Sequence, residues 1–138
     1  MMSKVTLYNT DYITVEYWPD HKLIYHTVHK PISEQLDMFK EALNAGTAAM
    51  EQYQVSKWLS DDRKNGPLTA EGNEWSFTNW QPRTLKAGWK YWGLVVPEML
   101  AAAGTLTPVI DTLFGMGLRM MVFTNVEEAL AWIDKMQD

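Results

Sequence analysis

Four consecutive polar side chains are the strongest chemical feature of this sequence. Ser60, Asp61, Asp62 and Arg63 directly follow an apolar run typical of a strand. Ligands of α/β proteins collect in the crevice at the carboxyl ends of strands, so we predict that these residues contact a partner. The alternative is a solvated loop in which the carboxylates cap or pair locally.

Other residue patterns do not form a recognisable catalytic or metal site. His21, His26 and His29 are candidate ligands, but residues three apart on a strand point to opposite faces, and the chain has no Cys. The Gly-x-Ser-x-Gly elbow of hydrolases is absent, and the glycines form no phosphate-binding loop with a Lys. Asp61 and Asp62 lack the partner residues of a phosphoacceptor receiver domain. We therefore expect no metal, no cofactor and no enzymatic activity.

An excess of aromatic residues marks the segment after the polar loop. The chain contains seven Trp, and Trp75, Phe77 and Trp80 lie in one expected helix. A regular helix cannot turn all three to one face, and Trp is enriched at interface hot spots. We predict a partner-binding surface here, with Trp80 as the most exposed of the three because it precedes Pro82. The alternative is that Trp75 and Trp89 pack on the sheet with their N–H groups bonded to backbone.

Nine Met residues form a second excess. Met fills irregular gaps and lines adaptable apolar sites. If the broken helix over residues 97–117 stands off the sheet, it would enclose a pocket for an acyl chain. The expected lining residues are Met99, Leu113, Phe114, Met116 and Met120. Core filling or a symmetric homodimer is the alternative use of this apolar segment.

The elements that must position these residues follow from hydrophobic spacing and turn residues. Strands are predicted over residues 4–8, 12–17, 23–28, 55–59, 91–96 and 118–123. Helices are predicted after caps at Ser33, Thr69 and Asn125 and after Pro97, with Pro82 interrupting the second. A hairpin followed by alternating helices and strands indicates an α/β domain, with a mixed sheet covered by helices and Val95 on a central strand.

Length and charge limit the classes of partner. The chain has 138 residues, which we interpret as one domain over residues 1–138, with residues 1–10 as an edge strand or arm. A net charge of −5 argues against nucleic acid or an anionic membrane as the main partner. No apolar run approaches the roughly 20 residues of a membrane span, and no signal peptide is visible. We therefore expect a cytoplasmic protein that is not embedded in a membrane.

Three stretches resemble a group of small bacterial STAS-like proteins, relatives of the anti-sigma-factor antagonists. The stretches are Lys57–Arg63, Gly93–Pro97 and Val122–Trp132. The resemblance covers roughly residues 12 to 136 and implies a single STAS-like domain that signals by binding protein partners.

In some members of that family, Ser or Thr phosphorylation in the loop before the second helix controls partner binding. The resemblance makes Ser60 and Thr69 the candidate sites, although the chain departs from the family's Asp-Ser-Gly-like pattern and Asp61 and Asp62 would repel the added charge. The core shape is also similar to that of the CRAL-TRIO lipid carriers. A carrier or sensor of a small apolar ligand is therefore the alternative function.

Overall fold

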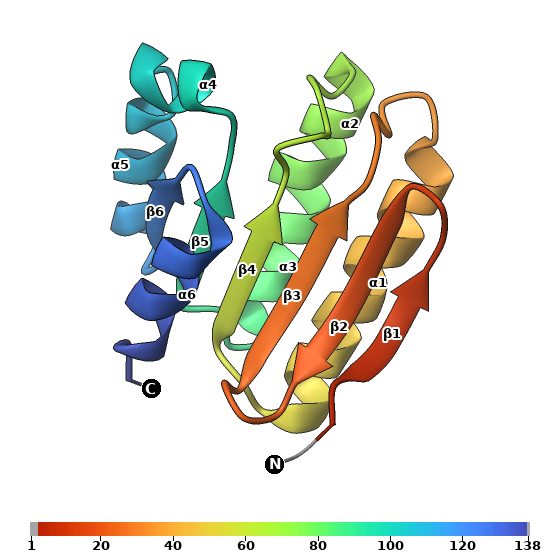
Figure 1. Cartoon of the computed structure of the whole chain (residues 1–138), viewed down its shortest axis with the longest axis vertical. Coiled ribbons are helices and arrows are strands. Elements are labelled where there is room, and N and C mark those ends of the chain that lie inside the picture. The colour runs from red at the N-terminus through yellow and green to blue at the C-terminus, as the bar shows by residue number, and fades with distance from the viewer. Residues whose placement is uncertain (1–2, 138) are drawn as a thin grey trace.

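A six-stranded mixed sheet organises the protein, as seen in the computed structural model, which describes residues 3–137 (Figure 1). The strand order follows the chain from one edge to the other. The antiparallel part comprises β1 (Val5–Asn9), β2 (Ile13–Trp18) and β3 (Leu23–Val28). Parallel to β3 run β4 (Lys57–Asp61), β5 (Tyr91–Val95) and β6 (Arg119–Phe123). The predicted α/β class is confirmed.

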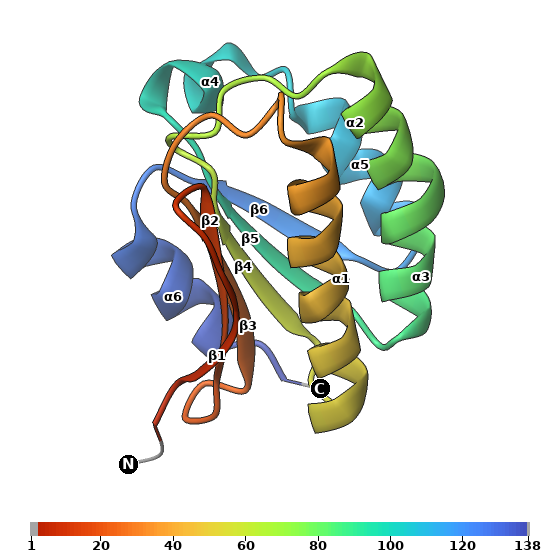
Figure 2. The same cartoon turned by 90° about the vertical axis from the view of Figure 1, so that its right-hand side faces the viewer.

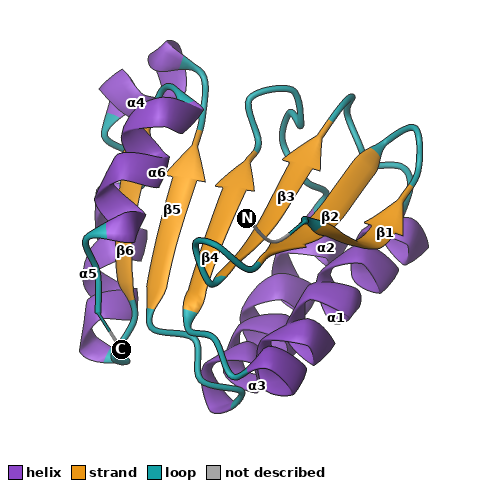
Figure 3. Ribbon diagram, turned by 60° about the horizontal axis from the view of Figure 1, so that its bottom comes forward, coloured by secondary structure: helices purple, strands orange, loops and turns teal. Residues whose placement is uncertain are grey.

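The hairpin predicted from the first aromatic and β-branched runs is confirmed and lies at one side of the sheet. β2 and β3 pair antiparallel from Ile13 opposite Val28 to Trp18 opposite Leu23. Along β2, Ile13 and Val15 are buried while Thr14 between them is half-buried, as expected for a strand with one covered face. β1 forms the edge of this part, as predicted (Figure 3).

Helices cover both faces of the sheet, but unequally (Figure 2). One face carries α1 (Leu36–Tyr53), α2 (Ala70–Trp75), the π-helix η1 (Ser76–Trp80), α3 (Gln81–Lys86) and α5 (Thr107–Gly115). The opposite face carries α6 (Val126–Asp134), and α4 (Glu98–Ala103) lies beyond the end of β5. Crossovers that step in one direction between parallel strands place their helices on one face, whereas α6 follows the last strand and is free to take the other.

The two faces have separate hydrophobic cores. The larger core lies under α1, η1 and α5 and includes Trp58, Trp80 and Leu113. The smaller core packs Ile133 of α6 against Leu59 and other residues of the sheet. Because both sides of β4 and β5 are covered, β4 is buried along its whole length and β5 over its last three residues.

Several predicted boundaries are wrong. α1 begins at Leu36 and not after Ser33, because Ile32 and Gln35 close a turn with a 2.8 Å hydrogen bond before the helix starts. β4 ends at Asp61, so Ser60 belongs to the strand and not to the following loop. β5, which carries the fully buried Val95, is next to the edge strand β6 and not at the centre.

Two predicted helix caps are confirmed. The Thr69 hydroxyl accepts a hydrogen bond from the Gly72 backbone N–H at 3.1 Å, and Asn125 Oδ1 accepts from the Glu128 N–H at 2.9 Å. None of the helices within residues 3–137 is long and apolar enough to span a membrane.

Pro82 does not break the second helical segment. The chain instead forms a π turn just before it, in which the Gln81 N–H donates to the Ser76 carbonyl, five residues back. Because Pro has no N–H and its ring crowds the preceding turn, a wider turn lets the helical path continue.

Candidate binding site

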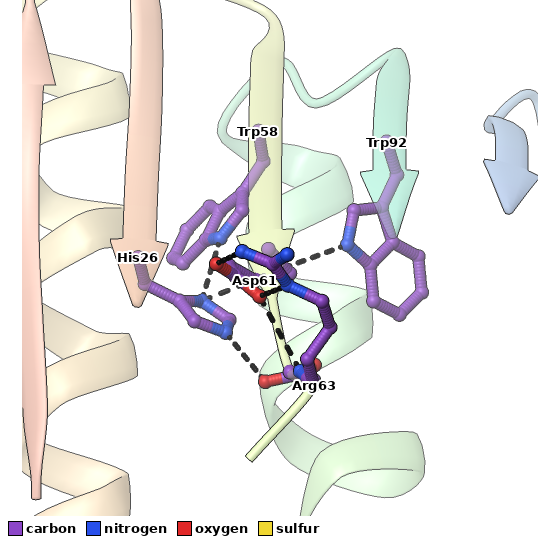
Figure 4. A network of polar contacts seen from close by, with 7 residues as sticks. His26, Trp58, Asp61, Arg63 and Trp92 are labelled. Carbon is purple, nitrogen blue, oxygen red and sulfur yellow. Dashed lines mark hydrogen bonds and ion pairs between the residues drawn. The ribbon is translucent and has the colours of Figure 1, made fainter. Parts of the chain in front are cut away.

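A hydrogen-bonded cluster lies at the carboxyl ends of β3, β4 and β5 (Figure 4). The Trp58 indole N–H donates to Nδ1 of His26 at 3.0 Å. Nε2 of His26 lies 3.0 Å from Oδ1 of Asp62, the first residue after β4. Because Nδ1 accepts, a neutral His26 carries its proton on Nε2 and donates it to Asp62. This chain of contacts orients a buried imidazole toward a partly exposed carboxylate.

Ser60 joins the same cluster, so the fold assembles a Ser, a His and an Asp. The Ser60 hydroxyl is 3.4 Å from His26 Nδ1 and accepts a hydrogen bond from the Trp92 indole at 2.9 Å. A hydrolytic triad needs a free base nitrogen and a hydroxyl that substrate can reach. Here Nδ1 already accepts from Trp58, and Ser60 is fully buried. The contacts hold the imidazole in place and do not activate the hydroxyl.

Asp61 and Arg63 form a separate ion pair beside this cluster (Figure 4). The guanidinium donates twice to the carboxylate, at 2.9 and 2.8 Å, and the Arg63 backbone N–H adds a 3.3 Å contact. Burial raises the pKa of Asp61, but the hydrogen bonds and charge of Arg63 outweigh it, so the pKa lies below its ordinary value. Asp61 is therefore an ionised, occupied carboxylate that positions the loop after β4.

A cavity of about 160 Å³ opens next to the His26 and Asp62 pair. Its walls are mainly apolar and come from α1, η1, β5 and the start of α5. The apolar lining residues are Phe39, Leu43, Leu68, Phe77, Trp80, Trp92, Leu94, Leu106, Val109 and Met120. Its charged or ionisable lining residues are His26 and Asp62, and none of the described lining residues is Lys or Arg.

Asn65 lines the same cavity and is the least satisfied polar side chain of the described region. It is 7% exposed, and its Oδ1 has no hydrogen-bond partner among residues 3–137. A buried acceptor without a partner is unfavourable, so Asn65 Oδ1 is an acceptor that a donor on a bound molecule would satisfy.

A second depression of about 240 Å³ adjoins the cavity. The two share Phe77, Gln81 and Val109 as lining residues. Leu113 and Met116 extend the second depression along α5. Phe77, which is 51% exposed, lies where both meet the surface. Together they form a mostly apolar site, and the polar residues that line the first cavity are His26, Asp62, Asn65, Asn73, Ser76 and Gln81.

The structure brings together part of the predicted partner-binding set. Asp62, Phe77 and Trp80 line the cavity, while Ser60 and Asp61 are buried at the end of β4. Arg63 is engaged by Asp61, and Trp75 packs edge-on against Phe39 of α1 with 6.1 Å between ring centroids.

The prediction that Trp80 is the most exposed of the three aromatics is wrong. Trp80 is 2% exposed and its indole N–H donates to the Thr47 hydroxyl at 3.1 Å, whereas Phe77 is the exposed residue. Residues five apart lie about 140° apart on a regular helix, but the π turn brings Trp75 and Trp80 nearer to one face.

The excess of Trp is absorbed by the core. The rings of Trp58, Trp80, Trp89 and Trp92 pack together, with centroids 4.9 to 6.2 Å apart. Each indole N–H has an acceptor, and that of Trp89 is a backbone carbonyl. The backbone hydrogen bond of the alternative interpretation is present at Trp89, whereas Trp58, Trp80 and Trp92 donate to the side chains of His26, Thr47 and Ser60.

The predicted Met-rich pocket does not form as one cavity. Leu113 and Met116 line the second depression and Met120 lines the first cavity. Phe114 faces a different depression beside β6 and α6, and Met99 on α4 is 85% exposed. Met120 also lines the depression that Phe114 faces, so the five side chains are divided among three hollows and the exposed surface of α4.

Sequence reasoning missed His26 and Asn65 as site residues. The three His were read as ordinary hairpin residues, and two of them do pair elsewhere: His21 with Asp134, and His29 with Thr14. His26 instead belongs to the site, because parallel pairing of β3 with β4 places it directly opposite Ser60. Within residues 3–137, no group of three His, Asp or Glu side chains is placed to hold a metal ion.

Comparison of the chain with protein-family models, with curated proteins and with solved structures found no match.

Proposed function

We propose that this protein binds a small, mainly apolar molecule in the cavity between the sheet, η1 and α5, as a non-catalytic carrier or sensor with a STAS-like fold. The observation that supports the proposal is the mostly apolar cavity beside the His26 and Asp62 pair, at the carboxyl ends of the parallel strands. Ligands of α/β proteins commonly bind at that end of the sheet. A cytoplasmic location belongs to the same proposal.

The volume indicates the size of the bound group. An apolar cavity of about 150 Å³ is sufficient for benzene, whereas sites for drug-sized ligands occupy about 300 Å³ or more. The cavity beside His26 and Asp62, at about 160 Å³, thus suits one ring or a short alkyl chain. A longer ligand would continue past Phe77 and Val109 into the adjoining depression.

The hydrogen bonding of the polar cluster supports binding over catalysis. Ser60, the only hydroxyl close to His26 in the cluster of described residues, is enclosed and accepts from Trp92. Phosphorylation of Ser60 would require the end of β4 to open, so it is not part of the proposed function. Thr69 is exposed at the start of α2 and stays a candidate for modification.

Binding of a protein partner is the second candidate function. Phe77 on η1 and Met116 just beyond α5 are both more than half exposed and line the second depression. Exposed aromatic and Met side chains around an apolar depression are typical of protein-recognition surfaces. A partner or a second copy would cover the mouth of the same cavity.

Filling the cavity tests the main proposal. Val109 lines both hollows, so Val109→Trp should occupy the volume that a ligand needs. Val5→Trp at the exposed edge of β1 adds the same side chain elsewhere and is the control. Native mass spectrometry of the freshly purified proteins should show a retained small molecule, or uptake of added toluene, in the wild type and the control alone. Equal uptake by a folded Val109→Trp variant would refute the proposal, and loss of a dimer or partner complex alone would favour the second candidate.

A further inference from the structure

We infer that the bound molecule carries a hydrogen-bond donor and no negative charge at the end that meets Asp62 and Asn65. This inference rests on the proposed function and specifies the chemical class of its ligand. It excludes fatty-acid-like anions in favour of short alcohols, amides or amines attached to an apolar body.

The charges of the residues that line the cavity support the exclusion of an anion. Asp62 lines the cavity, and its Oδ1 is engaged by His26. No Lys or Arg is among the described lining residues, and the nearest guanidinium in sequence, that of Arg63, is held by Asp61. A ligand carboxylate would lose its hydration and meet a like charge in mostly apolar surroundings. A neutral group avoids both costs, and a cationic group, which also loses its hydration, meets the opposite charge of Asp62 instead.

The free acceptor supports the need for a donor. Asn65 Oδ1 is buried without a hydrogen-bond partner among the described residues. The Asn65 backbone N–H donates to the Asp62 carbonyl at 3.1 Å, so a turn holds the two residues together. A hydroxyl, amide or ammonium group supplies the donor that Asn65 Oδ1 lacks, and the Asp62 carboxylate, already paired with His26, is a second acceptor beside it.

The apolar walls fix the rest of the ligand. Phe39, Leu43 and Leu94 surround the body of the cavity, and Trp80 and Trp92 present their rings to it. A molecule with a polar donor at one end and an apolar ring or short chain at the other matches this division. A purely polar molecule would bury no apolar surface of its own against these side chains, so binding would lack the favourable free energy of the hydrophobic effect.

The experiment compares three probes of equal chain length: 1-hexanol, hexylammonium and hexanoate. Binding is followed by tryptophan fluorescence and calorimetry at pH 8, where an ordinary His is neutral. We expect 1-hexanol to bind at least tenfold more tightly than hexanoate, with hexylammonium also ahead of hexanoate. Hexanoate binding as tightly as 1-hexanol would overturn the inference and leave the cavity proposal standing. If none of the three probes binds, and Val109→Trp retains or takes up as much small molecule as the wild type, both the inference and the proposed function are overturned.

Two variants assign the selectivity to the named residues. Asp62→Asn removes the negative charge and should narrow the gap between 1-hexanol and hexanoate at least threefold. Asn65→Leu removes the acceptor and should weaken 1-hexanol severalfold while leaving hexanoate unchanged. Asp111→Asn, an equal change of charge on the exposed surface of α5, should leave all three affinities as in the wild type. The inference falls if Asp62→Asn and Asp111→Asn have the same effect.

Discussion

His26 and Asp62 lie 36 residues apart in sequence, yet Nε2 of the imidazole is 3.0 Å from Oδ1 of the carboxylate. His26 lies on β3, and Asp62 directly follows the adjacent strand β4, with which β3 pairs in parallel. The other ring nitrogen accepts from Trp58, so a single side chain links the tryptophan core to the polar end of the cavity. This relationship makes His26 important for stability as well as for the site.

Replacing His26 tests that link. In His26→Leu the Trp58 indole N–H, which is buried, loses its acceptor. We expect a loss of about 1–3 kcal/mol in the free energy of unfolding, since a buried donor is left unpaired. Urea denaturation followed by circular dichroism measures the loss. His29→Leu, at the exposed end of the hairpin, is the control and should change stability little. Equal stabilities for both variants would contradict the structural role of His26.

Trp80 and Phe77 should respond in opposite ways to truncation. Trp80 is buried among other Trp rings, so Trp80→Ala should lower the free energy of unfolding by about 3–5 kcal/mol. Phe77 is half exposed at the mouth of the cavity, so Phe77→Ala should change stability by less than about 1 kcal/mol while weakening probe binding. Thermal melts beside binding titrations separate the two effects. A stable Trp80→Ala protein would contradict the buried placement.

The Asp61 and Arg63 pair predicts a dependence of stability on pH. The folded-state pKa of Asp61 lies below its ordinary value, because Arg63 outweighs the effect of burial. A carboxyl group of this kind adds stability above its ordinary pKa of about 4, and that stability is lost as the pH falls through the folded-state pKa. Arg63→Ala should therefore cost about 1–3 kcal/mol at pH 7 and progressively less below pH 4.

The matched control for that pair is Arg63→Lys, which keeps the charge without the two-pronged geometry. It should recover only part of the stability at neutral pH. Chemical denaturation of all three proteins at several pH values between 3 and 7 provides the measurement. A stability difference that does not change with pH would show that Arg63 acts through packing alone.

Gly46 should tolerate no side chain. It lies inside α1, where Ala ordinarily stabilises a helix by about 1 kcal/mol relative to Gly. A Cβ atom there would clash with Cη2 of the buried Trp58, however, and the ring has no free space to move into. We expect Gly46→Ala to destabilise the protein by about 1–3 kcal/mol. Ala48→Gly on the exposed side of α1 is the control, because it measures the difference in helix propensity between Ala and Gly without a packing contact. A Gly46→Ala protein more stable than the wild type would contradict the packing of α1 on Trp58.

Local sequence determined much of the secondary structure. The β-branched and aromatic runs specified the hairpin, and the side-chain caps at Thr69 and Asn125 marked two helix starts, because these signals act over a few neighbouring residues. Ser33 does not cap the helix, because it lies inside the turn that the hydrogen bond from the Gln35 N–H to the Ile32 carbonyl closes. The location of a candidate site after β4 followed from the same local pattern, since Asp62 does line the cavity.

Only the tertiary structure decided which side chains meet in that cavity. Parallel pairing places β3, β4 and β5 side by side, so that the indoles of Trp58 and Trp92 reach His26 and Ser60, and no spacing along the chain encodes those contacts. The π turn before Pro82 directs Trp80 inward and leaves Phe77 at the surface, against the geometry of a regular helix. Burial of a side chain depends on what the rest of the fold places over it. For this reason the sequence by itself determined the elements and the end of the sheet that matters, and the packing of distant segments determined the site.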